Sequence, residues 1–186
     1  MKKTFILACM ALSGLCASAQ QKGDMAVGLN LGVAPCLESG ASLTNFGIGA
    51  KFQYNVSNPV RLEAAFDYGF KDKETDVMTI GINGHYLFKV GEKFNIYPLA
   101  GVGYARIGMD IPQIEIPEIP GMEDYPGMED YLDMPTSLSS NKFYFNVGAG
   151  AEYAISDKFS VGLEVKYQYI ENFSRLPISI GATYKF

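Results

Sequence analysis

The sequence predicts an all-β protein: an eight-stranded antiparallel up-and-down transmembrane β-barrel. Three observations lead to this fold class. After residue 23, apolar side chains alternate with small or polar ones at a period of two, the spacing of a strand with two different faces. Eight such runs follow one another, most of them nine to twelve residues long. No helical periodicity and no stretch of about eighteen apolar residues occurs after the first 20 residues, so no membrane-spanning helix is expected there.

The first four runs alternate most clearly. In the first run, Val27, Leu29 and Leu31 alternate with Gly28 and Asn30. The next three repeat this pattern, with aromatic residues gathered toward their ends. The expected strands span residues 25–34, 46–55, 60–69 and 78–88.

The last four runs continue the pattern with one irregularity. In the fifth run, Ala100, Val102 and Tyr104 share an apolar face opposite Gly101 and Gly103. The sixth to eighth runs alternate cleanly, and the eighth closes the set. The expected strands span residues 94–107, 143–153, 159–169 and 176–186.

The connections between the runs fall into two sets. Residues 57–59, 89–93 and 155–158 are tight turns, with the Asn, Pro, Gly and Asp residues that such turns favour. Residues 108–141 form a long connection that contains eight acidic residues and no Lys or Arg. Because strands alternate in direction along a meander, we expect the tight turns and the long acidic loop at opposite ends of the barrel.

The first 19 residues are predicted to be a cleaved signal peptide. Two lysines precede an apolar stretch at 4–15, and residues 17–19 provide the small-x-small pattern of a cleavage site. As a helix, that stretch reaches only about 18 Å, short of a hydrocarbon core of about 30 Å, which disfavours a retained anchor. A lipid-modified Cys16 is disfavoured because a leucine precedes it. The barrel domain is expected over residues 22–186.

Charge and cysteine content exclude some function classes. The formal net charge is −5, and it becomes −7 without the two lysines of the signal peptide. Residues 108–141 carry −8, so the rest of the mature chain is close to neutral and has no basic footprint for nucleic acid. Cys36 is the only cysteine after residue 19, which argues against a disulfide-stapled scaffold.

The polar face indicates which side of the sheet meets lipid. It is rich in Gly, Ala, Ser and Asn, whereas a soluble sheet usually presents Lys, Glu, Thr and Arg to water. Small residues suit the interior of an eight-stranded barrel, which is just wide enough for side chains to fill. The charges on this face nearly balance, and we expect them to pair in a structural polar network because buried charges require partners. The expected network residues are Lys51, Arg61, Glu63, Asp67, His85, Glu152, Glu164 and Lys166.

His85 is the only histidine and the only candidate for a general base. A hydrolase or acyltransferase would pair it with a serine. Ser160 and Ser179 share its face, but no spacing brings either of them to it. The chain also lacks a GxSxG elbow, an HExxH pair and a phosphate loop. We therefore predict a protein that is not an enzyme, with no catalytic residues, no metal and no cofactor.

The long acidic loop contains an immediate repeat, PGMEDY followed by PGMEDY. Its proline and acid density favours an extended, mobile segment. It is interpreted as a solvated loop lengthened by duplication, as a ligand for a cationic extracellular partner, or as a weak calcium site, although no cage of ligands is evident. The candidate partner-binding residues are Glu123, Asp124, Tyr125, Glu129, Asp130 and Tyr131.

Two segments resemble a known family. Residues 178–186, with alternating apolar positions that end in Tyr184 and Phe186, look like the C-terminal assembly signal of outer-membrane barrels. The segment YPLAGVGY at 97–104 is similar to the fifth strand of small OmpA/OmpX and opacity-type barrels of the "porin family". The resemblance covers residues 22–186. It implies location in the bacterial outer membrane after export, contact with its lipid, and insertion by the barrel-assembly machinery.

Three functions remain to be distinguished. The favoured one is a structural or surface-interaction protein whose barrel anchors exposed loops. The alternative is a narrow pore or transporter for small solutes, which the width disfavours because porins use about 16–18 strands. A secreted soluble ligand-binding β-barrel is less favoured, and it would require an apolar interior and a charged exterior.

Overall fold

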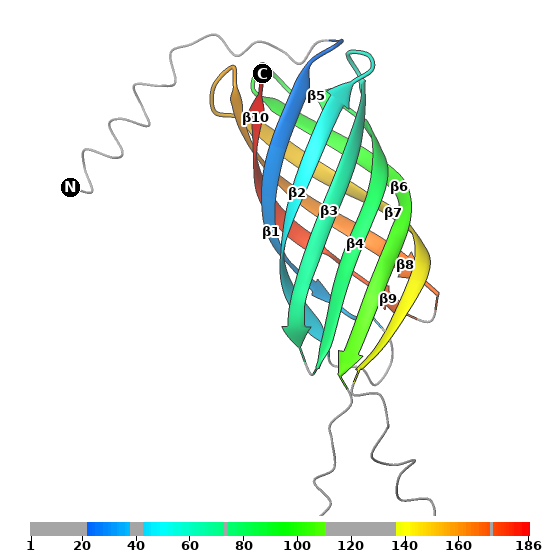
Figure 1. The fold of residues 1–186 in the computed structure, drawn as a ribbon. Helices are drawn as coiled ribbons and strands as arrows, with labels where there is room; N and C mark the ends of the chain where they lie inside the picture. The colour runs from blue at the N-terminus through cyan, green and yellow to red at the C-terminus, as the bar shows by residue number, and fades with distance from the viewer. Residues whose placement is uncertain (1–21, 38–42, 73, 111–136, 172) are drawn as a thin grey trace, which may run out of the picture.

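The computed structural model describes residues 22–37, 43–72, 74–110, 137–171 and 173–186. In this part of the chain, ten strands form one antiparallel sheet that closes on itself as a barrel (Figure 1). Eight strands form the wall of the barrel, and two short strands, β5 and β9, add to the sheet at its ends. The strands are β1 (Met25–Pro35), β2 (Thr44–Asn55), β3 (Val60–Asp72), β4 (Thr75–Tyr86), β5 (Phe88–Lys89), β6 (Phe94–Asp110), β7 (Ser137–Ala154), β8 (Phe159–Ile170), β9 (Phe173–Arg175) and β10 (Ile178–Lys185).

The barrel closes through its last strand. β10 pairs with β1 from Ala26↔Lys185 to Val33↔Ile178, and on its other side it pairs with β8. All other barrel strands pair with their neighbours in sequence, as in an up-and-down meander. In the described residues, closure pairs each of the eight long strands on both sides, as a lipid environment requires. This confirms the predicted fold class.

The two ends of the barrel differ. Phe186 and the start of β1 lie at one end, together with the turns that follow β2 and β7 (Figure 1). We call this the terminal end. The strands β6 and β7 run to the opposite end, which we call the loop end. No helix in the described residues is long and apolar enough to cross a membrane.

The two faces of the sheet have opposite chemistry. Outward side chains are apolar and open, with Leu29 71% and Ile180 62% exposed. Inward side chains include buried polar and charged groups such as Arg61, which is 1% exposed. This is the distribution predicted for a membrane barrel, and it is the reverse of the one that a soluble ligand-binding barrel requires.

Aromatic side chains pair on the outer face near both ends of the barrel. At the terminal end, the rings of Phe159 and Tyr184 lie 5.0 Å apart between their centroids. Near the loop end, Phe46 stacks on Phe70 at 6.1 Å. Such belts are favoured where a membrane meets water, because aromatic rings are most stable there.

The longest hairpin begins as paired strand where the sequence pattern predicted loop. The connection was expected at 108–141, but β6 continues to Asp110 and β7 starts at Ser137, with Gly108 opposite Ser139. Above the membrane both faces of a hairpin meet water, so the alternation of apolar residues ends. The backbone hydrogen bonds between two strands do not depend on that alternation, and they continue.

Candidate functional site

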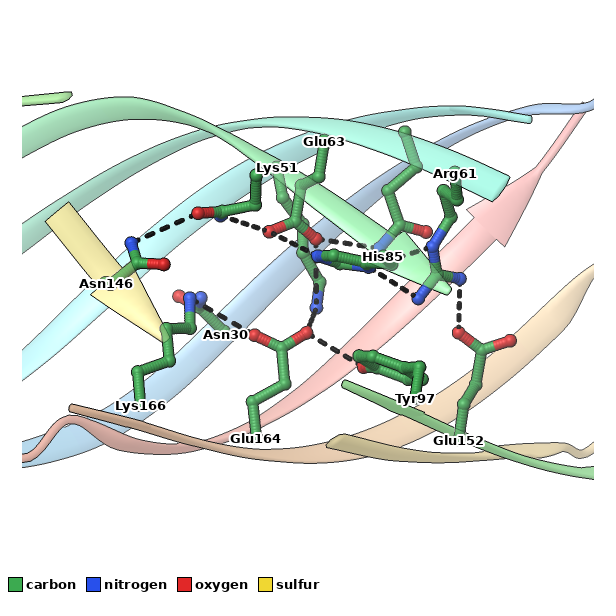
Figure 2. A network of polar contacts seen from close by, with 12 residues as sticks. Asn30, Lys51, Arg61, Glu63, His85, Tyr97, Asn146, Glu152, Glu164 and Lys166 are labelled. Atoms are coloured by element: carbon green, nitrogen blue, oxygen red, sulfur yellow. Dashed lines mark hydrogen bonds and ion pairs between the residues drawn. The ribbon is translucent and has the colours of Figure 1, made fainter. Parts of the chain in front are cut away.

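The strongest concentration of polar contacts lies inside the barrel. The eight residues predicted for the network lie on the inward face of β2, β3, β4, β7 and β8. Figure 2 shows seven of them, all except Asp67, pointing into the interior. Seven of them are buried, and Asp67 is half-buried. We call these residues, together with the other inward polar groups that bond to them, the interior network.

Glycines make room for the larger interior side chains. A Cβ atom added to Gly103 would lie 2.2 Å from the carbonyl oxygen of Ile80 and 2.7 Å from the ring of Tyr144. A Cβ added to Gly150 would lie 2.5 Å from the ring of Tyr97. At these two positions the small residue on the polar face has a direct packing cause, because an inward tyrosine occupies the space.

Arg61 organises the part of the network nearer the terminal end. Its Nη1 donates to Oε2 of Glu152 at 2.8 Å. Its Nε donates to Nδ1 of His85 at 3.1 Å. The guanidinium also lies 4.8 Å from the ring centroid of Tyr97, against which the His85 ring stacks at 4.9 Å. Arginine is thus held by an ion pair, a neutral acceptor and an aromatic face at once.

These contacts determine which nitrogen of the His85 ring carries the proton and what each nitrogen faces. Because Nδ1 accepts a hydrogen bond from Arg61, the neutral ring carries its proton on Nε2. That Nε2 lies 3.7 Å from Oε1 of Glu63. Within the described residues the imidazole nitrogens therefore face Arg61 and Glu63 and not a serine, so this arrangement does not provide a base–nucleophile pair.

In the middle of the interior network, two carboxylates, those of Glu164 and Glu63, each accept hydrogen bonds from several groups. Oε1 of Glu164 accepts hydrogen bonds from Lys51 and from the Tyr97 hydroxyl, both at 2.9 Å, and its Oε2 lies 3.2 Å from Nζ of Lys166. Glu63 accepts from Gln53 and Asn83 at 2.8 and 3.0 Å and lies 3.8 Å from Lys51. Figure 2 shows these groups meeting in the interior from different walls of the barrel.

Asp67 lies apart from the other predicted members. Its carboxylate accepts a hydrogen bond from Asn30 at 3.1 Å, in the half of the interior nearer the loop end. Arg175 of β9 reaches the same region and donates from Nε to Gln168. With Arg175 included, four buried cations and four acids balance in the interior.

Sequence reasoning missed several interior residues. Tyr97 and Leu99 lie on the inward face with Gly101 and Gly103, opposite Ala100 and Val102, so the alternation of the fifth run could have placed them inside. Arg175 lies in a connection whose residues do not alternate, so the pattern could not predict that its side chain points inward. Among the described residues, no cluster of three or more His, Cys, Asp or Glu side chains could hold a metal ion.

The other predicted site residues lie elsewhere. Phe186 is 61% exposed at the terminal end, and its backbone N–H donates to the Met25 carbonyl at 3.1 Å. Tyr184 packs against Phe159. The candidate partner-binding residues from Glu123 to Tyr131 fall outside the described residues. At the base of that hairpin Lys71 donates to Asp110, and this hydrogen bond raises the pKa of the Lys71 ammonium above its ordinary value.

Comparison with known proteins gives a consistent result. A family model described as outer membrane protein beta-barrel domain matches residues 5–186. The attachment invasion locus protein Ail of Yersinia pestis is 16% identical, with a TM-score of 0.61, over 89% of this chain and 100% of Ail. Neisserial surface protein A is 16% identical, with a TM-score of 0.68, over 87% of this chain and 97% of that chain.

A third solved structure extends the likeness to another genus. The N-terminal barrel domain of Pseudomonas aeruginosa OprF is 12% identical, with a TM-score of 0.56, over 90% of this chain and 100% of that chain. No curated protein sequence is significantly similar to the chain. At these identities the solved structures support the fold and leave the role of the barrel to be argued from its own residues.

Proposed function

The chain belongs to the family of outer membrane protein β-barrel domains, and from this premise we propose that its barrel is a closed, non-catalytic anchor that presents surface loops to an extracellular partner. The barrel lies in the bacterial outer membrane, with its apolar face against lipid. The proposal concerns what the barrel does there. It rests on the interior, on the long hairpin and on the charge of the connection between β6 and β7.

The ion pairs across the interior carry the proposal. Arg61 on β3 reaches Glu152 on β7, and Lys51 on β2 reaches Glu164 on β8, so two pairs join strands that are not neighbours. In the described residues the network separates a chamber of about 60 Å³ on the loop-end side from one of about 40 Å³ on the terminal side. These contacts support an anchor over the alternative of a pore or transporter for small solutes.

The loop end supplies the interaction surface in this proposal. β6 and β7 are the longest strands of the described residues, 17 and 18 residues, and both extend to the loop end of the barrel. Residues 108–141 contain eight acids and no base. A structure of Ail holds the heparin analogue sucrose octasulfate. A polyanion of that kind is a poor match for an acidic connection, so we propose a cationic partner for this chain.

Export and assembly follow from the same proposal. Residues 1–19 act as the cleaved signal peptide, and the last strand, with Tyr184 and Phe186, guides insertion by the barrel-assembly machinery. Both ends of the mature chain then lie on the periplasmic side, and the connection between β6 and β7 lies outside the cell.

The partner proposal is tested with variants of the acidic repeat. Bacteria displaying the protein are applied to separately immobilised basic and acidic extracellular proteins. The charge variant carries Glu123→Gln, Asp124→Asn, Glu129→Gln and Asp130→Asn. A matched variant carries Tyr125→Ser and Tyr131→Ser, which keeps every charge.

Cells with the native protein should bind the basic proteins, and the charge variant should lose most of this binding while folding normally. The tyrosine variant shows whether the rings add to recognition. Equal retention of native and charge-variant cells on every surface would contradict a cationic partner.

A further inference from the structure

The interior chamber nearer the loop end, which we call the loop-end chamber, is not filled by the network. It has a volume of about 60 Å³ and lies between the ends of β1, β2 and β3 on one side and β8, β9 and β10 on the other. One ordered water needs roughly 10–15 Å³ measured in this way. The loop-end chamber therefore has space for about four waters, or for one small polyatomic ion.

Two buried cations line the loop-end chamber. Arg175 is 5% exposed, and the hydrogen bond of its guanidinium goes to the neutral amide of Gln168. In the described residues it has no ion pair, although a guanidinium offers five N–H donors. Lys166 contacts Glu164 at 3.2 Å, which leaves further ammonium hydrogens for the chamber that it also lines. An occupant that accepts hydrogen bonds would satisfy these donors.

The loop-end chamber is also lined by a group that accepts hydrogen bonds. Asp67 lines the chamber and is half-buried, so its carboxylate is open to an occupant. It accepts one hydrogen bond, from Asn30 at 3.1 Å, and has further lone pairs.

The occupant must therefore accept hydrogen bonds on one side and donate them on the other. Chloride only accepts, and sulfate carries no hydrogen near neutral pH. The monoanion of phosphate does both: its bare oxygens suit Arg175 and Lys166, and its hydroxyls suit the Asp67 carboxylate. Its single charge also limits repulsion by the Asp67 carboxylate.

We propose that the loop-end chamber is a binding site for one hydroxyl-bearing oxyanion of the phosphate class. This inference is independent of the surface partner proposed above. The same chemistry is offered by free inorganic phosphate and by the end of a phosphate monoester. The volume favours the free ion, and the experiment separates the two.

The test uses the full barrel refolded in lipid nanodiscs. Phosphate, sulfate, chloride and glycerol 3-phosphate are titrated at matched ionic strength, and binding is followed by calorimetry and, for the two phosphates, by ³¹P line broadening. Inorganic phosphate should bind saturably, with the ester at least tenfold weaker, and sulfate and chloride should give no saturable signal. Ester binding equal to that of the free ion would move the assignment to a monoester.

Variants assign the signal to the chamber. Arg175→Gln should weaken phosphate binding at least tenfold. Arg106→Gln changes an exposed cation on the outer face of β6 and should bind as the native protein does. Asp67→Ala removes the acceptor and should reduce the preference for phosphate over sulfate.

The proposal is overturned if phosphate and sulfate act alike on the native protein, or if Arg175→Gln binds phosphate normally. The comparison of ions on the native barrel decides the matter even if the interior variants do not fold.

Discussion

Arg61 on β3 donates a 2.8 Å hydrogen bond to Glu152 on β7, across a barrel in which β4 and β6 stand between those two strands. The two residues are 91 positions apart in sequence. Lys51 and Glu164, separated by 113 positions, cross the interior in the same way. These ion pairs link walls of the barrel that are not adjacent, and the first predictions concern the loss of one such pair.

Arg61→Met should strongly destabilise the barrel. It removes the buried Arg61–Glu152 ion pair and the hydrogen bond from Arg61 to Nδ1 of His85, at a cost of about 3–5 kcal/mol. Urea unfolding in lipid vesicles measures this change in the free energy of unfolding. Lys142→Met, which breaks the exposed Lys142–Glu171 pair, should change it by less than about 1 kcal/mol. Similar effects of the two variants would contradict the role of Arg61.

The double variant Arg61→Met, Glu152→Met tests the same ion pair by removing both of its partners. Removing both charges does not leave one member of the pair in the interior without the other, so much of the loss caused by Arg61→Met should be recovered. The unfolding free energies of the two single variants and the double variant form one cycle. A double variant as unstable as the sum of the singles would show that the pair does not act as a unit.

Gly103→Ala should be destabilising because the new methyl group meets the backbone of β4. The nearest atom is the carbonyl oxygen of Ile80, which cannot rotate away, and overpacking of this kind costs about 1–3 kcal/mol. Gly84→Ala is the matched control, since its Cβ would approach only the Ala100 carbonyl at 3.9 Å. If unfolding in urea is the same for both variants, the close packing at Gly103 is wrong.

Tyr184 and Phe186 should separate stability from assembly. Tyr184→Ala removes the ring that packs on Phe159, and it should lower the stability of purified barrel. Phe186→Ala changes an exposed ring, so refolding in detergent should be nearly normal, whereas the amount inserted in living cells should fall. Normal insertion of Phe186→Ala in cells would contradict the assembly signal proposed for this residue.

The sequence predicted the two faces of the sheet because parity along a strand decides which side chains point inward. Lys51 and Glu164 were both placed in the interior by this rule. The ion pair between them could not be predicted, because it depends on how far each strand is shifted along its neighbour around the closed barrel. That shift sets the position of each residue along the barrel axis. Phe94 to Ile107 was recognised as a strand, but its continuation to Asp110 carries no alternation and depends only on pairing with β7.

The central claim is that the interior network closes the barrel. The most direct test is single-channel recording of the purified, refolded barrel in a planar bilayer, with an unboiled and a boiled sample on a gel to show that the barrel is folded. A barrel closed by its interior network should give a folded, faster-migrating unboiled band and no stable conductance steps. Steady, reproducible conductance from the folded native protein would contradict the closed anchor and support the narrow pore.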